Sequence, residues 1–347
     1  MALLDLNKFS LVSKKTKSLA DMKSIQFPLL STPKNALIEI LKSLEMYYLV
    51  EFSLLSKKVK SLTEALNVKP MPIDIDVTNR MVIFANRILP VCRLVKFENP
   101  GVLVEQKKAG CQPKIDLKEY LAHVLSFTKQ TTVRKLLFRK NLDETFLPTV
   151  FYCVPNCENV HIFRNVPVSA QRKILSKYRN ATKQLILNSI PPAKLRANMV
   201  AQNFDCLSGR YITNRWMNLE DLLIANCAGL GIYRIDVRIL NKFLKLWTRI
   251  KCNPRLEYLW AHGMDINVDM KTVLAGIVNK KVSTDTVRIF RHSKKVIESD
   301  VDWLTMTDTV EVRGGYDFQR KDGTIATVAV RRVNGIRKME FFVWNCV

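Results

Sequence analysis

Cysteine, histidine and glycine supply most metal ligands, nucleophiles and phosphate-binding loops, but this chain does not arrange them for such chemistry. None of its eight cysteines forms a CxxC pair, and Cys153 and Cys157 have no second Cys or His pair nearby to complete a zinc site. No HExxH, P-loop or GxGxxG motif occurs. The four histidines are isolated in the sequence: His123, His161, His262 and His292. We therefore predict no metal, no cofactor and no catalytic residue.

The positively charged side chains offer a different kind of chemistry, namely binding of anions. Residues 159–204 contain no acidic residue and eight basic ones: Arg164, Arg172, Lys173, Lys177, Arg179, Lys183, Lys194 and Arg196. If the strands of this segment form a concave face, it would present a positive surface that suits acidic or phosphorylated peptides. The alternative is that these charges lie on the outer, solvated side of helices.

Composition points to a folded, strongly basic protein. The chain has 347 residues, 48% of them hydrophobic, and a net charge of +24. Such a charge favours acidic partners, nucleic acid or a membrane surface. No nucleic-acid-binding motif is present and aromatic residues are not interleaved with the basic stretch, which argues against nucleic acid. We see no signal peptide and no apolar run of 18 residues, so we expect an intracellular protein, cytoplasmic or nuclear, with reduced thiols and no membrane contact.

Three short amphipathic helices are predicted near the amino terminus, after a Lys- and Ser-rich segment at 1–24. Pro28 and Pro33 fix an extended entry. The first helix then carries an apolar stripe with helical spacing, a second follows around Leu49, and Ser56 can cap a third. Three helices in about 40 residues bury too little surface to be stable alone, so they need a partner or a following domain.

Residues 27–62 resemble an F-box, the adaptor motif of cullin-based ubiquitin ligases. The family pattern is followed in register by Pro33, by the leucine-rich helix ending in Leu44-Glu45, and by Leu55-Ser56-Lys57. The sequence of this stretch is especially similar to nematode F-box families. Thr32 and Val59 depart from the usual Leu and Trp. The resemblance implies an F-box at 25–66 that binds a Skp-family linker, and through it a cullin, by these residues: Pro33, Leu37, Ile40, Leu41, Leu44, Leu49, Leu54 and Val59.

After a Pro-containing linker at 67–76, alternating strands and helices are expected through 77–347. The runs 81–85 and 92–97 can pair as a hairpin, 98–115 looks like a loop, and 116–128 predicts a helix. Short apolar strands then recur every 25 to 36 residues, which is typical of a repeat array. We expect them at these positions: 135–138, 159–163, 184–187, 221–225, 256–260 and 286–290.

One unit matches the leucine-rich-repeat pattern, with Leu219, Leu222, Ile224 and Cys227 in its key positions. An ordinary α/β domain is the alternative, and Gly229 to Gly231 is expected to be a turn. Residues 236–250 predict a helix capped by Asp236. Four strands at 309–313, 316–320, 324–330 and 339–344, with a turn at Asp322-Gly323, predict a small antiparallel sheet that closes the array. The expected fold class is therefore α/β: a three-helix F-box, a leucine-rich-repeat-like array and a terminal antiparallel sheet.

The region from 218 onward resembles the type-two F-box-associated domain, on the segments 218–227, 240–247, 253–259 and 320–328. With the F-box, this implies a non-catalytic substrate-recognition adaptor of a Skp–cullin–F-box ubiquitin ligase, whose domain at 77–347 holds an acidic or phosphorylated target protein. The alternative is a basic nucleic-acid-binding or general protein-interaction module with a degenerate F-box.

Overall fold

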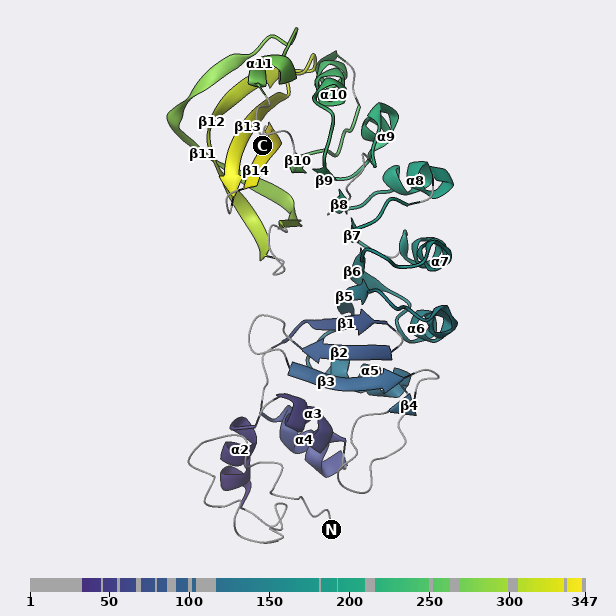
Figure 1. The fold of residues 1–347 in the computed structure, drawn as a ribbon. Coiled ribbons are helices and arrows are strands. Elements are labelled where there is room, and N and C mark those ends of the chain that lie inside the picture. Colours follow the sequence, from purple (N-terminus) through teal and green to yellow (C-terminus); the bar gives the residue numbers. More distant parts are fainter. Residues whose placement is uncertain are drawn as a thin grey trace. The chain divides into compact units, whose positions relative to one another are not determined.

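The structure is a computed structural model, and its chain divides into two compact units (Figure 1). The smaller contains 1–74, 82–97 and 102–131, and the larger contains 75–81, 98–101 and 132–347. The residues that the structure describes are 33–44, 46–54, 57–66, 70–78, 80–85, 92–98, 102–103, 117–180, 182–191, 193–209, 216–249, 252–262, 269–298, 305–333 and 336–344.

The smaller unit begins with the three expected helices, α2 (Lys34–Lys42), α3 (Met46–Ser53) and α4 (Lys57–Glu64). Pro33 stands at the amino-terminal cap of α2 with a ψ of 138°, an extended conformation that the φ fixed by its ring allows. The strands β2 (Arg80–Ala85) and β3 (Cys92–Glu98) are neighbours, as predicted, and β4 (Val102–Leu103) adds a short strand where only a loop was expected. Helix α5 (Leu117–Phe127) follows and is confirmed. Thr32, Ser56 and Asp116 lie outside the described residues.

The strand β1 (Ile73–Val77) corrects the expected linker at 67–76. Its side chains Ile73, Ile75 and Val77 are buried. The alternation Ile-Asp-Ile-Asp-Val is a strand pattern, and the prolines that precede it end only the segment leading to it.

The larger unit contains a parallel array of strands in register, namely β5 (Val133–Phe138), β6 (Cys157–Ile162), β7 (Gln184–Leu187), β8 (Cys206–Gly209), β9 (Gly229–Tyr233) and β10 (Tyr258–His262). The helices α6 (Leu147–Cys153), α7 (Val168–Tyr178), α8 (Ala193–Val200), α9 (Leu219–Ile224) and α10 (Val237–Arg249) lie on one side of it (Figure 1). This confirms an alternating strand–helix array.

One row of apolar residues across the array forms the core beneath the helices. In-register leucine and valine side chains from successive strands are buried: Leu136, Val160, Leu185, Leu207, Leu230 and Leu259. The row continues to Phe341, whose ring packs edge-on against Phe243 and Trp247 of α10. These contacts identify the helix-covered face of the sheet, and α10 itself is the helix predicted from its apolar spacing.

The repeat register predicted at 218–227 is wrong. Residues 221–225 do not form a strand, because the Asn218 side chain accepts from the Asp221 N–H and the Asp221 carboxylate accepts from the Asn218 N–H. This reciprocal capping box starts the short helix α9. The strand of this unit is β9 instead, in the stretch that we expected to be a turn.

The carboxyl-terminal strands form an antiparallel extension of the array. The order across the larger unit is β11-β12-β13-β14-β10-β9-β8-β7-β6-β5, with β11 (Lys280–Glu298), β12 (Thr305–Gln319), β13 (Ile325–Val333) and β14 (Ile336–Trp344). Strand β14 pairs antiparallel with β10, so the predicted closure of the array is confirmed. Residues 286–290 are not an array strand but part of β11, and the two strands expected at 309–320 are one, β12. The short helix α11 (Met270–Val273) precedes β11.

Candidate interaction surfaces

The eight residues predicted to bind the linker fall into two groups in the smaller unit. Four are buried and hold its helices together: Leu37, Leu41, Leu49 and Val59. Pro33 and Ile40 are exposed, and Leu44 and Leu54 are half-buried. Pro33, Ile40 and Leu44 follow one another along and just after α2. Because Ile40 is 37% exposed, part of its apolar surface stays in water, and with Pro33 and Leu44 it is available to a partner.

A hydrogen bond ties the helices of the predicted F-box to α5. The hydroxyl of Ser53 on α3 donates to the carbonyl of Val50 at 2.6 Å, and the Nε2 atom of His123 on α5 lies 2.7 Å from the Ser53 oxygen. Because the hydroxyl proton is used, Nε2 is the donor of the second bond. The three helices thus have a polar anchor on the segment that follows them, which meets their expected need for a supporting element.

The basic residues of 159–204 lie mainly on and around helix α7. Arg172, Lys173 and Lys177 are exposed on α7, while Arg164 follows β6 and Lys183 precedes β7. We expected a positive surface on the strand face, but Arg172, Lys173 and Lys177 lie on the helix instead. The helical alternative applies to them, because residues 168–178 contain the apolar spacing that buries Ala170, Ile174 and Tyr178 and turns the polar positions outward.

Some of these charges are already paired within the larger unit. Lys173 binds Glu144 at 2.9 Å, Lys183 lies 3.9 Å from Glu158, and Arg196 binds the buried Asp221 at 3.0 Å. Hydrogen bonds from Ser169 and from Lys173 hold the pKa of Glu144 below its usual value.

Other basic side chains of the stretch remain available. Among the described residues, no carboxylate lies within ion-pair distance of Arg164, Arg172, Lys177 or Arg179. Arg172 and Lys177 are thus exposed α7 residues that can meet an acidic partner.

The strand face opposite the helices is polar but buried. Lys135, Asn159 and Gln184 stand in register on β5, β6 and β7, and each is buried, as are His161 and Ser208 one rung further on. Buried side chains present no surface to a ligand, so this ladder serves the interior of the unit.

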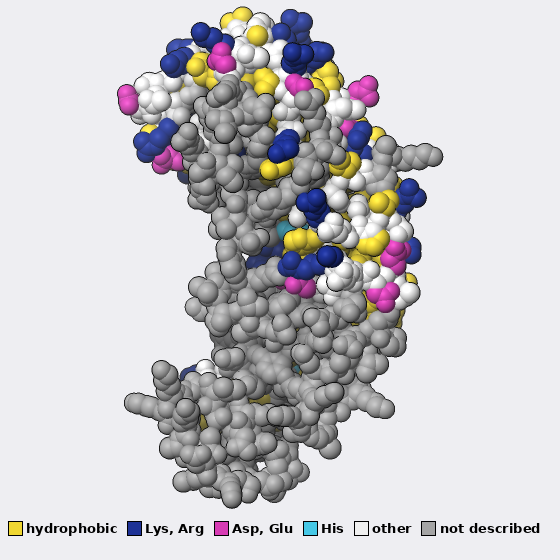
Figure 2. Space-filling model, in the orientation of Figure 1, with side chains coloured by type: hydrophobic (Ala, Val, Ile, Leu, Met, Phe, Trp, Pro, Cys, Tyr) yellow, Lys and Arg dark blue, Asp and Glu magenta, His cyan; other side chains and the backbone are white. Residues whose placement is uncertain are grey.

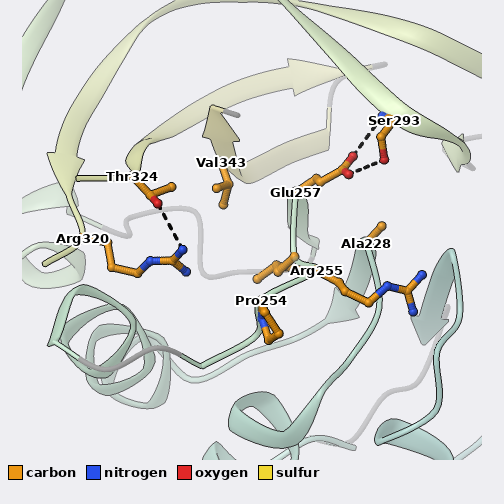
Figure 3. A pocket seen from close by; sticks show the side chains of 9 residues that line it. Ala228, Pro254, Arg255, Glu257, Ser293, Arg320, Thr324 and Val343 are labelled. Carbon is orange, nitrogen blue, oxygen red and sulfur yellow. Dashed lines mark hydrogen bonds between the residues drawn. The ribbon is translucent and has the colours of Figure 1, made fainter. Parts of the chain in front are cut away.

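A small pocket of about 190 Å³ lies where the start of β10 meets the terminal sheet (Figure 3). Arg320 and Glu257 stand on opposite sides of it. Arg320 donates to Thr324 at 3.1 Å and pairs with Asp322, while Glu257 accepts from the N–H of Ser293 at 2.9 Å and from its hydroxyl. Both charged side chains are already paired within the fold, so neither is left to bind a ligand in the pocket.

Thiols and carboxylates are the remaining groups that could bind a metal or react. Within the described part of the chain, no three His, Cys, Asp or Glu side chains lie close enough to hold a metal ion. Burial raises the pKa of the Cys157 and Cys227 thiols to about 12, so both stay protonated and unreactive at neutral pH. No helix in the described ranges is long and apolar enough to cross a membrane.

Two families match this chain. Residues 33–70 match the family described as F-box domain, and residues 197–261 match the family described as F-box associated. The chain therefore contains an F-box domain, which includes α2, α3 and α4, and an F-box-associated domain. No curated protein and no solved structure matches it.

The F-box-associated segment spans the part of the array from α8 to β10. Its described residues meet in tight internal contacts. Asn253 donates to the carbonyls of Leu222 and Ala225, at 2.7 and 2.8 Å, which fixes the end of α9 against the loop before β10. The matched residues thus build scaffold, and the strands that follow β10 lie outside the match. The resemblance seen in the sequence extends beyond this match, to 320–328. We expected 286–290 to be an array strand, although the alternation in Val287-Arg288-Ile289-Phe290 could have identified a half-exposed strand.

Proposed function

We propose that this F-box protein is the substrate-recognition subunit of a Skp–cullin–F-box ubiquitin ligase. The observation that carries the proposal is an F-box domain that leaves apolar side chains exposed at Pro33, just before its first helix, and at Ile40 within it, with Leu44 half-buried just after it. Burying such residues against a partner gives about 25 cal/mol for each Å² of apolar surface removed from water. The partner is a Skp-family linker, which connects to the cullin.

The mechanism is scaffolding and needs no catalytic residue in this chain. The F-box domain binds the linker, and residues 77–347 hold a target protein near the ubiquitin-conjugating enzyme. The rate gain comes from the raised effective concentration of the target's lysines. The buried residues Leu37, Leu41, Leu49 and Val59 support this binding indirectly, because they position the helices that present the exposed ones.

The target arm of the proposal concerns acidic or phosphorylated proteins. The exposed guanidinium and ammonium groups of Arg172 and Lys177 favour carboxylate or phosphate partners. The double charge reversal Arg172→Glu and Lys177→Glu is expected to weaken target capture and leave linker capture intact. Lys173 is a poorer choice for this test, because reversing it also breaks its ion pair with Glu144. Undiminished target capture by the double variant would remove α7 from the binding surface.

The linker arm is tested by capture of purified Skp-family linker by the whole chain. Ile40→Asp places a charge on the exposed face of α2 and is expected to weaken capture by about tenfold or more, and Leu44→Asp is expected to act in the same direction. Val278→Asp is the matched control, because Val278 is 95% exposed in the larger unit. Equal capture by Ile40→Asp and the control would refute the linker arm.

The net charge of +24 favours one alternative, a basic nucleic-acid-binding or general interaction module with a degenerate F-box. Counterion release makes such binding fall steeply with salt. Capture of linker that survives 0.5 M salt but not Ile40→Asp supports the adaptor. Capture that salt alone removes supports the alternative.

A further inference from the structure

Strand β11 is the outer edge of the sheet in the larger unit. It runs for 19 residues, and in the described part of the chain it pairs with β12 alone. An edge strand of this kind has one side of N–H and C=O groups without a neighbouring strand, which is a template for adding another extended chain. In Figure 1, β11 is the outermost strand of the terminal sheet, and its Ser293 N–H, beyond residues 287–291, donates to Glu257 just before β10.

A central part of β11 is regular enough to receive a strand. The pairing with β12 shifts register between Val282 and Val287 and again between Arg291 and Val296. Between these shifts, residues 287–291 pair one for one with residues 313–309. The register shifts interrupt the edge on either side, as β-bulges do, so they leave a defined five-residue window.

The side chains on the two faces of this window have different surroundings. Arg288 and Phe290 point inward. Arg288 makes a bidentate ion pair with Asp317, at 2.9 and 3.0 Å, and lies over the Trp344 ring at 4.7 Å. Phe290 belongs to a buried cluster that includes the rings of Tyr258, Trp260 and Phe342. These contacts hold the window rigidly, so an incoming chain would not need to order it.

The outward face carries two large apolar side chains that the fold leaves in water. Val287 is 44% exposed and Ile289 is 54% exposed. Their cross-strand neighbours on β12 are Arg313 and Glu311, which are also exposed. Figure 2 shows hydrophobic and basic side chains next to one another over the terminal sheet. Exposed apolar residues at alternate positions are what a strand-binding edge uses for specificity.

The charge of β11 decides what kind of chain fits. Apart from Arg288, which Asp317 already binds, it contains five basic residues, Lys280, Lys281, Arg291, Lys294 and Lys295, against Asp285 and Glu298. A second copy of β11 would bring the same basic set opposite itself, and like charges across a strand pair are destabilising. An acidic chain is instead attracted by the exposed side chains of Lys280, Lys281 and Arg291.

We propose that the β11 edge at residues 287–291 binds an extended acidic segment of the target by strand addition. Main-chain hydrogen bonds to the edge supply affinity, Val287 and Ile289 contact alternate apolar side chains of the segment, and the basic flanks attract its carboxylates. The inference rests on the proposed function, since it names the form in which that target is held.

The test uses the whole chain and a defined probe, a fluorescein-labelled decapeptide of alternating Val and Glu. Binding is measured by fluorescence anisotropy at up to millimolar protein, and the bound site by amide hydrogen exchange of residues 283–292. Ile289→Glu is expected to weaken binding by about tenfold or more, because it removes apolar contact and repels the probe. Ile325→Glu is the matched control, since Ile325 is an exposed isoleucine on β13, a strand with neighbours on both sides.

Two further probes separate backbone pairing from simple charge attraction. The same peptide with alternate N-methyl groups keeps its charge but loses the donors for strand pairing, and an alternating Val and Lys peptide keeps the donors but reverses the charge. We expect both to bind at least about tenfold more weakly. Protection of β11 amides by the acidic probe alone supports strand addition.

Three outcomes would overturn the proposal: no binding of the acidic peptide, binding that Ile289→Glu leaves unchanged, or equal binding of its N-methylated form. Linker capture is scored on the same samples. A chain that captures linker but not peptide refutes strand addition and keeps the adaptor. A chain that binds peptide but not linker refutes the adaptor alone.

Discussion

His123 on α5 and Ser53 on α3 are 70 residues apart in the sequence, yet their side chains are joined by a hydrogen bond of 2.7 Å. The imidazole is partly buried, and this burial is the main cause that lowers the pKa of His123. The positive charge of Lys60 on α4 lowers the pKa further, while Glu64 acts in the opposite direction. The neutral imidazole is therefore the form that the folded unit favours.

This pKa shift predicts an acid-sensitive smaller unit. A histidine whose pKa is lower in the folded than in the unfolded state binds more protons when unfolded, so acid favours unfolding. Its contribution to stability is complete above the unfolded pKa of about 6.5 and is lost as the pH falls through that value toward the folded pKa. We expect the melting temperature of this unit to fall by a few degrees between pH 7.5 and 5.

The variant His123→Gln tests this assignment, because glutamine keeps an N–H donor for Ser53 but does not titrate in this range. Its melting temperature should depend less on pH than that of the natural chain, as measured by calorimetry in matched buffers. An unchanged dependence would mean that other groups cause the acid sensitivity. Linker capture at pH 5 and 7.5 should follow the same order.

Much of the fold could be predicted from hydrophobic periodicity, and α10 shows why. Its apolar residues Leu240, Phe243, Leu244 and Trp247 recur with helical spacing over 13 residues, long enough to exclude a strand. The terminal hairpin was equally predictable, because Gly323 has φ of +91° after Asp322 and few other residues adopt that conformation.

The stretch 218–233 could not be predicted in the same way. Short apolar runs suit both helices and strands, and Leu222-Leu223-Ile224 is one of them. Only the pairing of Asn218 with Asp221 identifies a helix there. The glycines of β9 are typical of a turn, so its sequence does not indicate a strand. The exposed β11 window depends on which strands neighbour it, which is set by contacts distant in sequence. For the same reason, the sequence could not show which of the predicted linker-binding residues are buried.

The capping box at α9 is expected to matter for stability. Asn218→Ala removes the side-chain acceptor for the Asp221 N–H and should lower the free energy of unfolding by about 1 kcal/mol. Glu220→Ala is the control, because Glu220 is exposed in the same helical turn. Denaturant unfolding measures both. Equal effects of the two variants would show that α9 is held by packing and not by its cap.

Gly231 on β9 is expected to be intolerant of any side chain. A Cβ atom at this position would lie 2.4 Å from the Ser208 hydroxyl oxygen and 2.5 Å from the Trp260 ring. Gly231→Ala should therefore destabilise the larger unit by about 1 to 3 kcal/mol through overpacking. Thr309→Ala, an exposed change on β12, should have little effect in the same unfolding experiment. If Gly231→Ala were as stable as that control, Trp260 would have room to move.

The buried carboxylate of Glu340 on β14 supports the terminal sheet. It accepts from Arg331 and Tyr258 and lies 3.1 Å from the ammonium of Lys338, and the side chains of Glu340 and Lys338 are 0% and 1% exposed. Burial alone would raise the pKa of Glu340, but hydrogen bonds from Arg331 and the charge of Lys338 hold it below its usual value. The stability it contributes is therefore present above the unfolded pKa of about 4.3 and is lost as the pH falls through the lower, folded value.

Removing this charge should be more harmful than removing one of its partners. Glu340→Gln leaves the buried Lys338 ammonium without its carboxylate, and we expect a loss of about 3 to 5 kcal/mol. Lys338→Met should cost less, because Arg331 still pairs with Glu340 and methionine fits among the aromatic rings that Lys338 faces. Glu311→Gln, on the exposed face of β12, is the control. Denaturant unfolding at pH 7 ranks the three, and a larger loss for Lys338→Met than for Glu340→Gln would mean that the ammonium, through its aromatic contacts, is the group on which this cluster depends.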